Sequence, residues 1–327
     1  MVDKKLRGMI PAVVTPLTKA GKLDKSALRW IIDSIMENGG NGVMVLGTTG
    51  EGPLHTREVA VDMIETSVEL VGHRGVVIAG TTAVTMEQSM YYADSASSAG
   101  AAAVLTIPPF YFNLEDEEVV RYYTRYADRC RIPVMIYHMP SVSRRMIGLA
   151  AVKELSRHGN IRGIKDSSGN FLFFQELAGE FENNPDFSVF MGKALLIYSA
   201  LAVGADGTMT PTGNLMPKLE QEIYRLFQSG DLEKARKAQG KLFRIFQEMN
   251  ANGRDLGTTI NGILSLRGIT ANCAPDYIEP LTMAEAERLN EKIYAILGEQ
   301  SVSDDRNEKE MIWNERLASY RAGRIGH

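Results

Sequence analysis

The residues that decide the fold and the chemistry of this chain are IRGIKDSSG, at positions 161–169. The first half is apolar enough to form a short strand buried on both faces, and the chain then breaks into the polar turn DSSG. Lys165 therefore stands at the carboxyl end of a buried strand. Removing the hydration of a lysine ammonium favours the neutral amine, which can attack a carbonyl carbon. The alternative is a lysine that reaches solvent or pairs with Asp166.

Outward from this stretch, the chain alternates between short apolar runs and segments of helical period, with a repeat of roughly 30 residues, the length of one βα unit. We expect strands at residues 9–15, 43–46, 76–80, 102–106, 133–137, 161–165, 187–191 and 204–209. Eight parallel strands at this spacing predict an α/β fold, the (β/α)8 TIM barrel. An open doubly wound sheet is the alternative, but it usually has a glycine-rich phosphate turn after its first strand, and the residues here are Thr15-Pro16-Leu17.

After the eighth strand the pattern becomes helical only. The helical windows are residues 217–229, 232–250, 258–267 and 282–297. We therefore expect a catalytic barrel over 1–225, a C-terminal helical domain over 226–298 and a polar tail over 299–327.

The composition favours a small-molecule substrate. Of the 327 residues, 44% are hydrophobic, which is enough for a sizeable core. A net charge of −4 and a pI near 5.8 lack the basic excess that nucleic acid or an anionic membrane would attract. Cys130 and Cys273 match no metal spacing, so reduced thiols are expected. Because the sequence also lacks a secretory signal and any run of about 18 apolar residues, we expect a cytoplasmic protein with no nucleic-acid or membrane partner.

Polar side chains follow two further strands of the predicted barrel. The sequence GTTGE at 47–51 follows the second strand, and its backbone N–H groups with the hydroxyls of Thr48 and Thr49 form a neutral cradle for a carboxylate. A turn capped by Thr49 is the alternative. The fifth strand ends in Tyr137, whose phenol can relay a proton; the alternative is a core tyrosine bonded to backbone.

Because the carboxyl ends of barrel strands meet at one face, these groups form one site. A buried lysine, a neighbouring tyrosine and a carboxylate cradle suit a 2-oxo acid, whose keto carbon condenses with Lys165 to give an iminium that accepts electrons. No metal or organic cofactor is needed. The histidines considered as ligands have no metal-ligand spacing, and these are His55, His73, His138 and His158.

Four motifs occur in an order and spacing that are specific to one family: GTTGE at 47–51, PFY at 109–111, YHMP at 137–140 and GIKDSSG at 163–169. Through them the chain, from about residue 6 to residue 297, resembles the dihydrodipicolinate synthase and N-acetylneuraminate lyase family of Schiff-base aldolases. The resemblance implies a homotetrameric barrel with a C-terminal helical domain, acting on pyruvate-type substrates.

The resemblance also implies roles for individual residues. Lys165 is the Schiff-base residue and Tyr137 the proton relay, while Tyr111 completes the relay across a subunit contact. The residues that it assigns to the pyruvate half of the site are Gly47, Thr48, Thr49 and Gly207.

Departures from the family pattern bear on the substrate. Dihydrodipicolinate synthases have an arginine where this chain has Val142; Arg144 and Arg145 lie a little further along. Sialic acid lyases have an acidic pair and a serine in the loops after the seventh and eighth strands. The corresponding residues here are Ala194, Leu195 and Pro211.

We therefore predict a class I 2-oxo acid aldolase or lyase with pyruvate as one partner. A 2-oxo-3-deoxy sugar acid dehydratase or a hydratase-aldolase would use the same iminium. Dihydrodipicolinate synthase (4-hydroxy-tetrahydrodipicolinate synthase) is a second alternative, and a non-catalytic 2-oxo acid sensor lies outside this class. The candidates for the variable half of the pocket are Phe110, Phe112, Val142, Ser143, Arg144 and Ser167.

Overall fold

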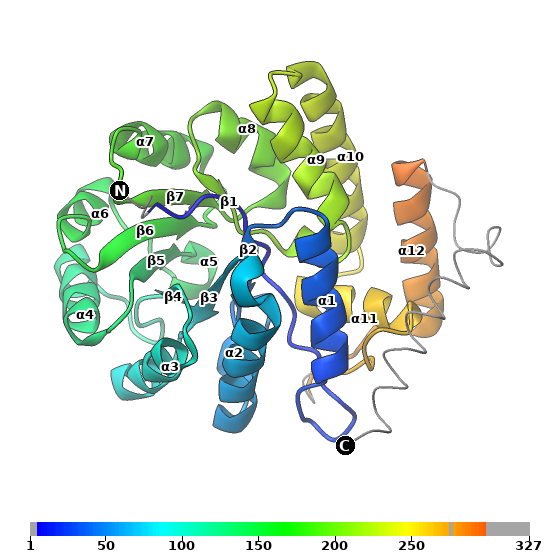
Figure 1. The fold of residues 1–327 in the computed structure, drawn as a ribbon, viewed down its shortest axis with the longest axis horizontal. Coiled ribbons are helices and arrows are strands. Elements are labelled where there is room, and N and C mark those ends of the chain that lie inside the picture. The colour runs from blue at the N-terminus through cyan, green and yellow to red at the C-terminus, as the bar shows by residue number, and fades with distance from the viewer. Residues whose placement is uncertain (1–4, 275–276, 299–327) are drawn as a thin grey trace.

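Eight parallel strands form a barrel in the computed structural model, which describes residues 5–274 and 277–298. The strands are β1 (Gly8–Met9), β2 (Gly42–Val45), β3 (Val76–Gly80), β4 (Ala103–Thr106), β5 (Val134–His138), β6 (Ile161–Asp166), β7 (Ser188–Met191) and β8 (Gly207–Thr208). Their order is β1, β8, β7, β6, β5, β4, β3, β2, and a parallel bridge between Ala12 and Met44 brings the first segment against β2. The ring is nearly closed, which confirms the predicted (β/α)8 barrel (Figure 1).

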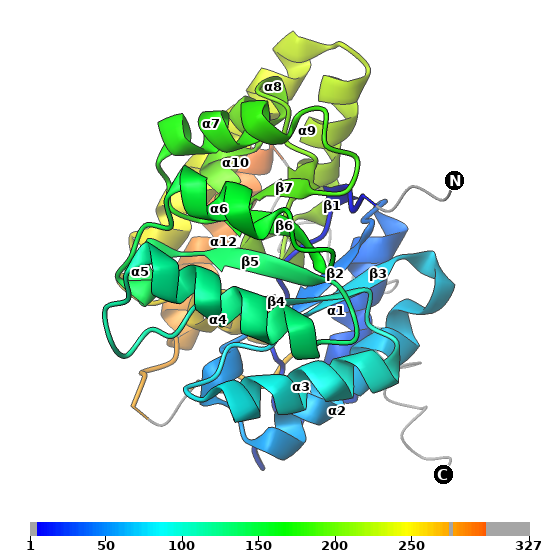
Figure 2. The ribbon, with the colours of Figure 1, turned by 90° about the vertical axis from the view of Figure 1, so that its left-hand side faces the viewer.

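Helices alternate with the strands and cover the outside of the barrel, as Figure 1 and Figure 2 show. The helices of this layer are α1 (Lys25–Glu37), α2 (Arg57–Val71), α3 (Met86–Ala99), α4 (Asp116–Arg129), α5 (Pro140–Ser143), α6 (Leu149–Leu155), α7 (Phe171–Phe181) and α8 (Ile197–Ala202). Short 3-10 turns η1 (Gly52–Leu54), η2 (Gly72–Arg74), η3 (Ala194–Leu196) and η4 (Pro211–Asn214) complete the loops. Such crossovers are what parallel neighbouring strands require.

The first helix shows how local sequence sets an element. The Asp24 side chain accepts hydrogen bonds from the N–H groups of Ser26 and Ala27, at 3.1 Å each, and so caps the helix. The residues that α1 buries against the barrel recur with helical spacing, and they include Leu28, Ile31, Ile32 and Ile35. The cap and this apolar face together fix where α1 begins and which side faces the sheet.

Side chains alternate across the strands and fill two apolar layers. On β5, Met135 and Tyr137 belong to the cluster inside the barrel, whereas Val134 and Ile136 pack outward among the helices. The cause is the two-residue period of a strand. Lys165 of β6 is in register with Tyr137 and therefore shares its inward face.

Two strands are shorter than the sequence predicts. The strands expected at 9–15 and 204–209 are β1 and β8, of two residues each. Pro11 has no N–H to donate toward β2, which leaves that side of the first segment with an incomplete ladder. On the other side, hydrogen bonds from Ile10 N to Thr208 O and from Ala12 N to Thr210 O continue the pairing beyond the two short strands. Gly204 has a φ of +94° directly after α8, and only beyond this turn does the chain become extended. The other six strands match the prediction within one residue at each end.

The C-terminal helices match the predicted windows within two residues. They are α9 (Pro217–Gln228), α10 (Leu232–Asn250), α11 (Leu256–Leu266) and α12 (Met283–Leu297). Helix α10 packs along α9, and α12 packs against α10 and α11 beside the barrel (Figure 1). The division at 225/226 stays a prediction, and the tail predicted over 299–327 lies outside the described residues.

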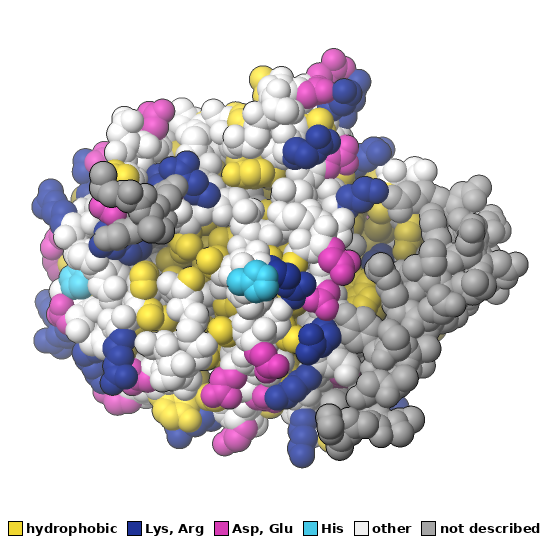
Figure 3. Space-filling model, viewed as in Figure 1, with side chains coloured by type: hydrophobic (Ala, Val, Ile, Leu, Met, Phe, Trp, Pro, Cys, Tyr) yellow, Lys and Arg dark blue, Asp and Glu magenta, His cyan; other side chains and the backbone are white. Residues whose placement is uncertain are grey.

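The described surface, helices and cysteines can be compared with what the composition predicts. On the face drawn in Figure 3, lysine and arginine side chains are interspersed with acidic ones. Between residues 5 and 298, the 275–276 gap aside, no helix has both the length and the apolar content to cross a bilayer. The thiols of Cys130, which is buried, and Cys273, which is half-buried, are both free.

Candidate active site

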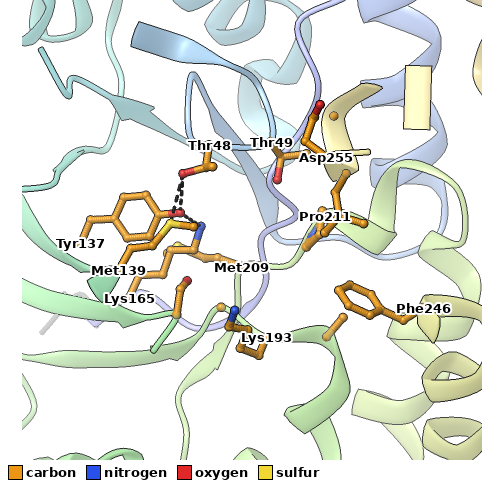
Figure 4. Close-up of a pocket in the computed structure, with 15 residues that line it drawn as sticks. Thr48, Thr49, Tyr137, Met139, Lys165, Lys193, Met209, Pro211, Phe246 and Asp255 are labelled. Carbon is orange, nitrogen blue, oxygen red and sulfur yellow. Dashed lines mark hydrogen bonds between the residues drawn. The ribbon is translucent and has the colours of Figure 1, made fainter. Parts of the chain in front are cut away.

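A cavity of about 160 Å³ opens at the carboxyl ends of the strands. Figure 4 shows the side chains that line it. The lining residues from the barrel and its loops are Thr48, Thr49, Tyr137, Met139, Lys165, Ser167, Gly192, Lys193, Ala194, Met209 and Pro211. The ends of β2, β5, β6, β7 and β8 thus meet around one space, as the strand-end argument predicts.

Lys165 and Tyr137 form the centre of this cavity. The lysine side chain is only 3% exposed, and its Nζ lies 3.5 Å from the Tyr137 hydroxyl and 4.4 Å from the centroid of the tyrosine ring. The lysine therefore does not reach out to solvent. Its burial beside a phenol places an amine and a proton donor within reach of one bound carbonyl group.

Asp166 is not the partner of Lys165, because alternation along β6 turns its carboxylate to the outer face of the barrel. There Asp166 accepts a hydrogen bond from His138 Nδ1 at 2.7 Å. The other ring nitrogen of His138, Nε2, accepts from the N–H of Ile147 at 3.2 Å, which assigns the neutral Nδ1–H tautomer. Since both residues are buried, this network ties the loop after β5 to the end of β6.

The GTTGE loop supplies the two threonines. Thr48 Oγ1 lies 3.2 Å from the Tyr137 hydroxyl and 3.2 Å from the sulfur of Met139. Within the described residues, the backbone N–H groups of Thr48 and Thr49 donate to no carbonyl. These N–H groups, with the hydroxyl of Thr49 that lines the cavity, remain available to an anionic group.

Gly192 after β7 makes room for two of these side chains. A Cβ atom at this position would lie 2.0 Å from the Oγ of Ser167 and 3.1 Å from the Cε of Lys165. Ser167 is buried and lines the cavity from the loop after β6. A side chain at 192 would therefore displace Ser167 and crowd the lysine.

Several predicted site residues do not line the cavity. Gly207 is pressed against β1, because a Cβ there would lie 2.1 Å from the carbonyl oxygen of Gly8. The Ser143 hydroxyl donates to the backbone of the loop after β5 instead. Arg144 and Tyr111 are exposed, the latter at 77%. The others outside the lining are Gly47, Phe110, Phe112 and Val142.

The C-terminal helices contribute lining residues that no sequence pattern indicates. Phe246 of α10 and Asp255, Leu256 and Gly257 at the start of α11 line the cavity. Lys193 lines the cavity as well, and its position shortly after the end of β7 is the sequence feature that could have predicted this. The cavity therefore lies between the barrel mouth and the C-terminal helices.

Two acids meet where the GTTGE loop contacts α11. Glu51 adopts a left-handed backbone, with a φ of +52°, and among the described residues its buried Oε1 has no hydrogen-bond partner. Burial, with a smaller contribution from the charge of Asp255, raises the pKa of Glu51 to about 7. A neutral Glu51 at lower pH removes the repulsion between the two carboxylates at this contact.

A third acid, Glu220 of α9, is fully buried below the loop after β8. Its Oε1 accepts hydrogen bonds from the hydroxyls of Thr210 and Thr212. Burial outweighs these bonds and raises the pKa of Glu220 to about 7 from an ordinary value of 4.5.

Glu220 gives a prediction for stability. Because its pKa is higher in the folded chain, the proton stabilises the folded state below pH 4.5, and this contribution is lost as the pH rises to about 7. The loss is about 3 kcal/mol of unfolding free energy. Urea unfolding at about pH 5 and about pH 8, at one protein concentration, should show a drop that is smaller by roughly that amount in Glu220→Gln. An identical drop in both proteins would contradict the assignment.

Comparisons with known proteins place this geometry in context. A sequence model described as the dihydrodipicolinate synthetase family matches residues 5–298. The 4-hydroxy-tetrahydrodipicolinate synthase of Geobacter metallireducens is 29% identical over 293 residues, 90% of this chain and 98% of the relative. That of Oceanobacillus iheyensis is 31% identical over 244 residues, 75% of this chain and 82% of the relative.

Solved structures show the same similarity. YagE of E. coli K12, a prophage protein of the dihydrodipicolinic acid synthase family in complex with pyruvate, has a TM-score of 0.83 and 25% identity, covering 89% of this chain and 99% of YagE. The dihydrodipicolinate synthase of Bacteroides thetaiotaomicron has a TM-score of 0.83 and 27% identity, covering 90% and 98%. The similarity extends over the barrel and the C-terminal helices.

Proposed function

This chain belongs to the dihydrodipicolinate synthetase family, and we propose that it is a class I 2-oxo acid aldolase that cleaves or forms a C–C bond with pyruvate as one partner. Members of the family are lyases that form a Schiff base between a lysine and the substrate, without an external cofactor. The observation that supports the proposal most directly is the buried amine of Lys165, 3.5 Å from the Tyr137 hydroxyl inside a cavity.

In the proposed reaction, Schiff-base formation is the first step. The neutral amine of Lys165 attacks C2 of the 2-oxo acid, and a proton moves from nitrogen to oxygen to give a carbinolamine. The Tyr137 phenol then donates a proton to the departing hydroxyl, so that water leaves and an iminium remains. The short distance between Nζ and this phenol supports the assignment of both roles.

Cleavage follows from the iminium. The electrons of the C3–C4 bond form the C2–C3 double bond, and the π electrons of the iminium move to nitrogen, which gives a neutral enamine. At the same time the C4 hydroxyl gives its proton to the Tyr137 oxygen and C4 becomes an aldehyde carbon. Protonation of the enamine at C3 and hydrolysis of the iminium release pyruvate and restore Lys165. Addition runs through the same steps in reverse.

The carboxylate of pyruvate is proposed to lie on the GTTGE loop. The N–H groups of Thr48 and Thr49, which donate to no carbonyl in the described chain, and the Thr49 hydroxyl support this role. Such an orientation directs C2 toward Lys165, because Thr48 contacts Tyr137, the cross-strand neighbour of the lysine. Ser167 adds a hydroxyl on the β6 side.

Assembly and location are part of the same proposal. We expect a homotetramer in the cytoplasm, in which Tyr111 of one subunit completes the proton relay of another. The exposure of Tyr111, at 77%, and its edge-to-face contact with the exposed Phe112 are consistent with a subunit contact at this loop.

A second candidate is 4-hydroxy-tetrahydrodipicolinate synthase, the activity named for the relatives from Geobacter metallireducens and Oceanobacillus iheyensis. Its acceptor, aspartate semialdehyde, has a carboxylate of its own. Val142 stands where the family pattern has the arginine for that group, and Arg144 is exposed outside the cavity lining. For this reason we place the aldolase first.

Product analysis tests the proposal. The protein is incubated with a panel of 2-oxo-3-deoxy acids, and in parallel with pyruvate plus aspartate semialdehyde, and the products are identified by mass spectrometry. Pyruvate release is followed with lactate dehydrogenase. An aldolase releases pyruvate together with an aldehyde.

The other outcomes separate the alternatives. Loss of water without release of pyruvate would indicate the dehydratase, and condensation with aspartate semialdehyde would indicate the synthase. Failure of borohydride to trap pyruvate on the wild-type protein would contradict every Schiff-base assignment.

A further inference from the structure

The cavity contains a second lysine that the proposed reaction does not use. Lys193 follows β7, is half-buried, and lines the same space as Lys165. Figure 4 shows both side chains at the cavity, with Lys193 on the side away from Thr48. In the strand order, β6 lies between β5 and β7, so the two lysines come from adjacent strand ends.

Within the described residues, Lys193 forms no ion pair. The acid that lines the cavity, Asp255, is engaged elsewhere, because its two carboxylate oxygens accept from the N–H of Thr258 at 2.9 Å and from the Thr258 hydroxyl at 2.7 Å. The residue after Lys193, Ala194, is buried and apolar. A half-buried ammonium without a counter-ion loses solvation, which an anionic ligand compensates.

The position of Lys193 indicates which end of a substrate it meets. Thr48 and Tyr137 are hydrogen-bonded to each other on the β5 side of Lys165, whereas Lys193 comes from the β7 side. A 2-oxo acid joined to Lys165 through C2, with its C1 carboxylate on the GTTGE loop, therefore has its far end available to Lys193.

We propose that Lys193 binds a second carboxylate at the far end of the substrate, so that the preferred substrates are 2-oxo dicarboxylic acids. This inference rests on the proposed Schiff-base function. Lys193 takes no covalent part and acts as a specificity-determining residue. In cleavage, the fragment released with pyruvate is then an aldehyde that bears a carboxylate but, unlike aspartate semialdehyde, no ammonium group beside it, because the Lys193 ammonium would repel such a group.

A carboxylate fits better than a phosphate. Among residues 5–274 and 277–298, the cavity lining has no arginine, and the other cation in it is Lys165. Arg145 pairs with Asp116 at 3.0 Å and Glu115 at 3.3 Å outside the lining. A phosphate has three strongly accepting oxygens and close to two charges, which one lysine beside the apolar Ala194 does not satisfy.

Trapping with chosen 2-oxo acids tests the inference without knowledge of the natural substrate. The concentration that gives half-maximal borohydride trapping is measured for 2-oxoglutarate and 2-oxoadipate, which cover two lengths of diacid, and for 2-oxohexanoate, which has an apolar end. The proteins are the wild type, Lys193→Met, Lys193→Arg and Lys218→Met. Lys218 is an exposed lysine of α9 outside the cavity, so its variant controls for lost protein charge.

For the wild type, we expect one diacid to be trapped at a concentration about 10- to 100-fold lower than 2-oxohexanoate. Lys193→Met should reduce this ratio to about 1, Lys193→Arg should retain most of it, and Lys218→Met should leave it unchanged. No preference for either diacid in the wild type, or a preference that survives in Lys193→Met, would overturn the inference.

Trapping of pyruvate in the same experiment distinguishes failure of the Lys193 role from failure of the Schiff-base function. If pyruvate is trapped but diacids have no advantage, only the role of Lys193 fails. If pyruvate is not trapped at all, the Schiff-base function fails and the role of Lys193 fails with it.

Discussion

Lys165→Met is expected to lower the rate of C3 proton exchange in pyruvate by about 10⁵-fold, the scale seen when an enzyme loses its nucleophile. The iminium acidifies the C3 protons, and without an amine at this position no iminium forms. Methionine has nearly the length of lysine and suits the buried, apolar surroundings, so the fold should persist. Exchange in deuterium oxide is followed by proton NMR and requires no knowledge of the acceptor.

Lys218→Met provides the matched control, because it removes one exposed lysine from α9. Exchange at the wild-type rate is expected in this variant. Should Lys165→Met exchange pyruvate protons within about tenfold of the wild type, another amine would have to be the nucleophile and the assignment of Lys165 would be wrong.

Tyr137→Phe is expected to lower the same exchange rate by about 10²- to 10⁴-fold, the usual contribution of a positioned acid or base. The ring and its packing inside the barrel remain, whereas the hydroxyl 3.5 Å from Lys165 Nζ and 3.2 Å from Thr48 Oγ1 is lost. The pyruvate concentration for half-maximal rate should change much less than the maximal rate, because the cradle is retained.

Tyr91→Phe serves as the control for a lost tyrosine hydroxyl, since Tyr91 lies on α3 and is 43% exposed. It should exchange pyruvate protons like the wild type. A Tyr137→Phe protein whose maximal rate stayed within about threefold of the wild type would exclude this phenol as the proton relay.

Much of the centre of the site follows from sequence because strand ends converge in a barrel. Lys165 and Tyr137 lie 28 residues apart in the chain but are cross-strand partners in register. Period-two alternation also decides that Lys165 faces inward while Asp166 faces out to His138. Strand position alone therefore predicts which of two adjacent polar residues enters the cavity.

The remaining parts of the site depend on packing between residues that are far apart in the sequence. Nothing in the local sequence around Asp255 or Phe246 indicates that α10 and α11 reach the barrel mouth. The exposure of Arg144 depends on the left-handed turn that ends α5, with a φ of +56°, and residue spacing does not specify this turn. The sequence places Lys193 just after a predicted strand, so its position at the barrel mouth can be predicted. Its lack of a counter-ion among the described residues follows only from the three-dimensional structure.

The role predicted for Tyr111 cannot be assessed within a single chain. Its motif suggests a catalytic role, yet within one chain its side chain is exposed and outside the cavity lining. A role for this residue needs a second copy of the chain, so the prediction concerns assembly as much as chemistry.

Mapping the site of the borohydride-trapped pyruvate decides most directly whether Lys165 is the Schiff-base residue. Trypsin does not cleave after a modified lysine, so an adduct on Lys165 appears on the peptide 163–193, whereas one on Lys193 appears on the peptide 166–218. We predict an adduct on 163–193 in the wild type and none in Lys165→Met. An adduct on 166–218 alone, or no adduct in the wild type, would contradict the proposed mechanism.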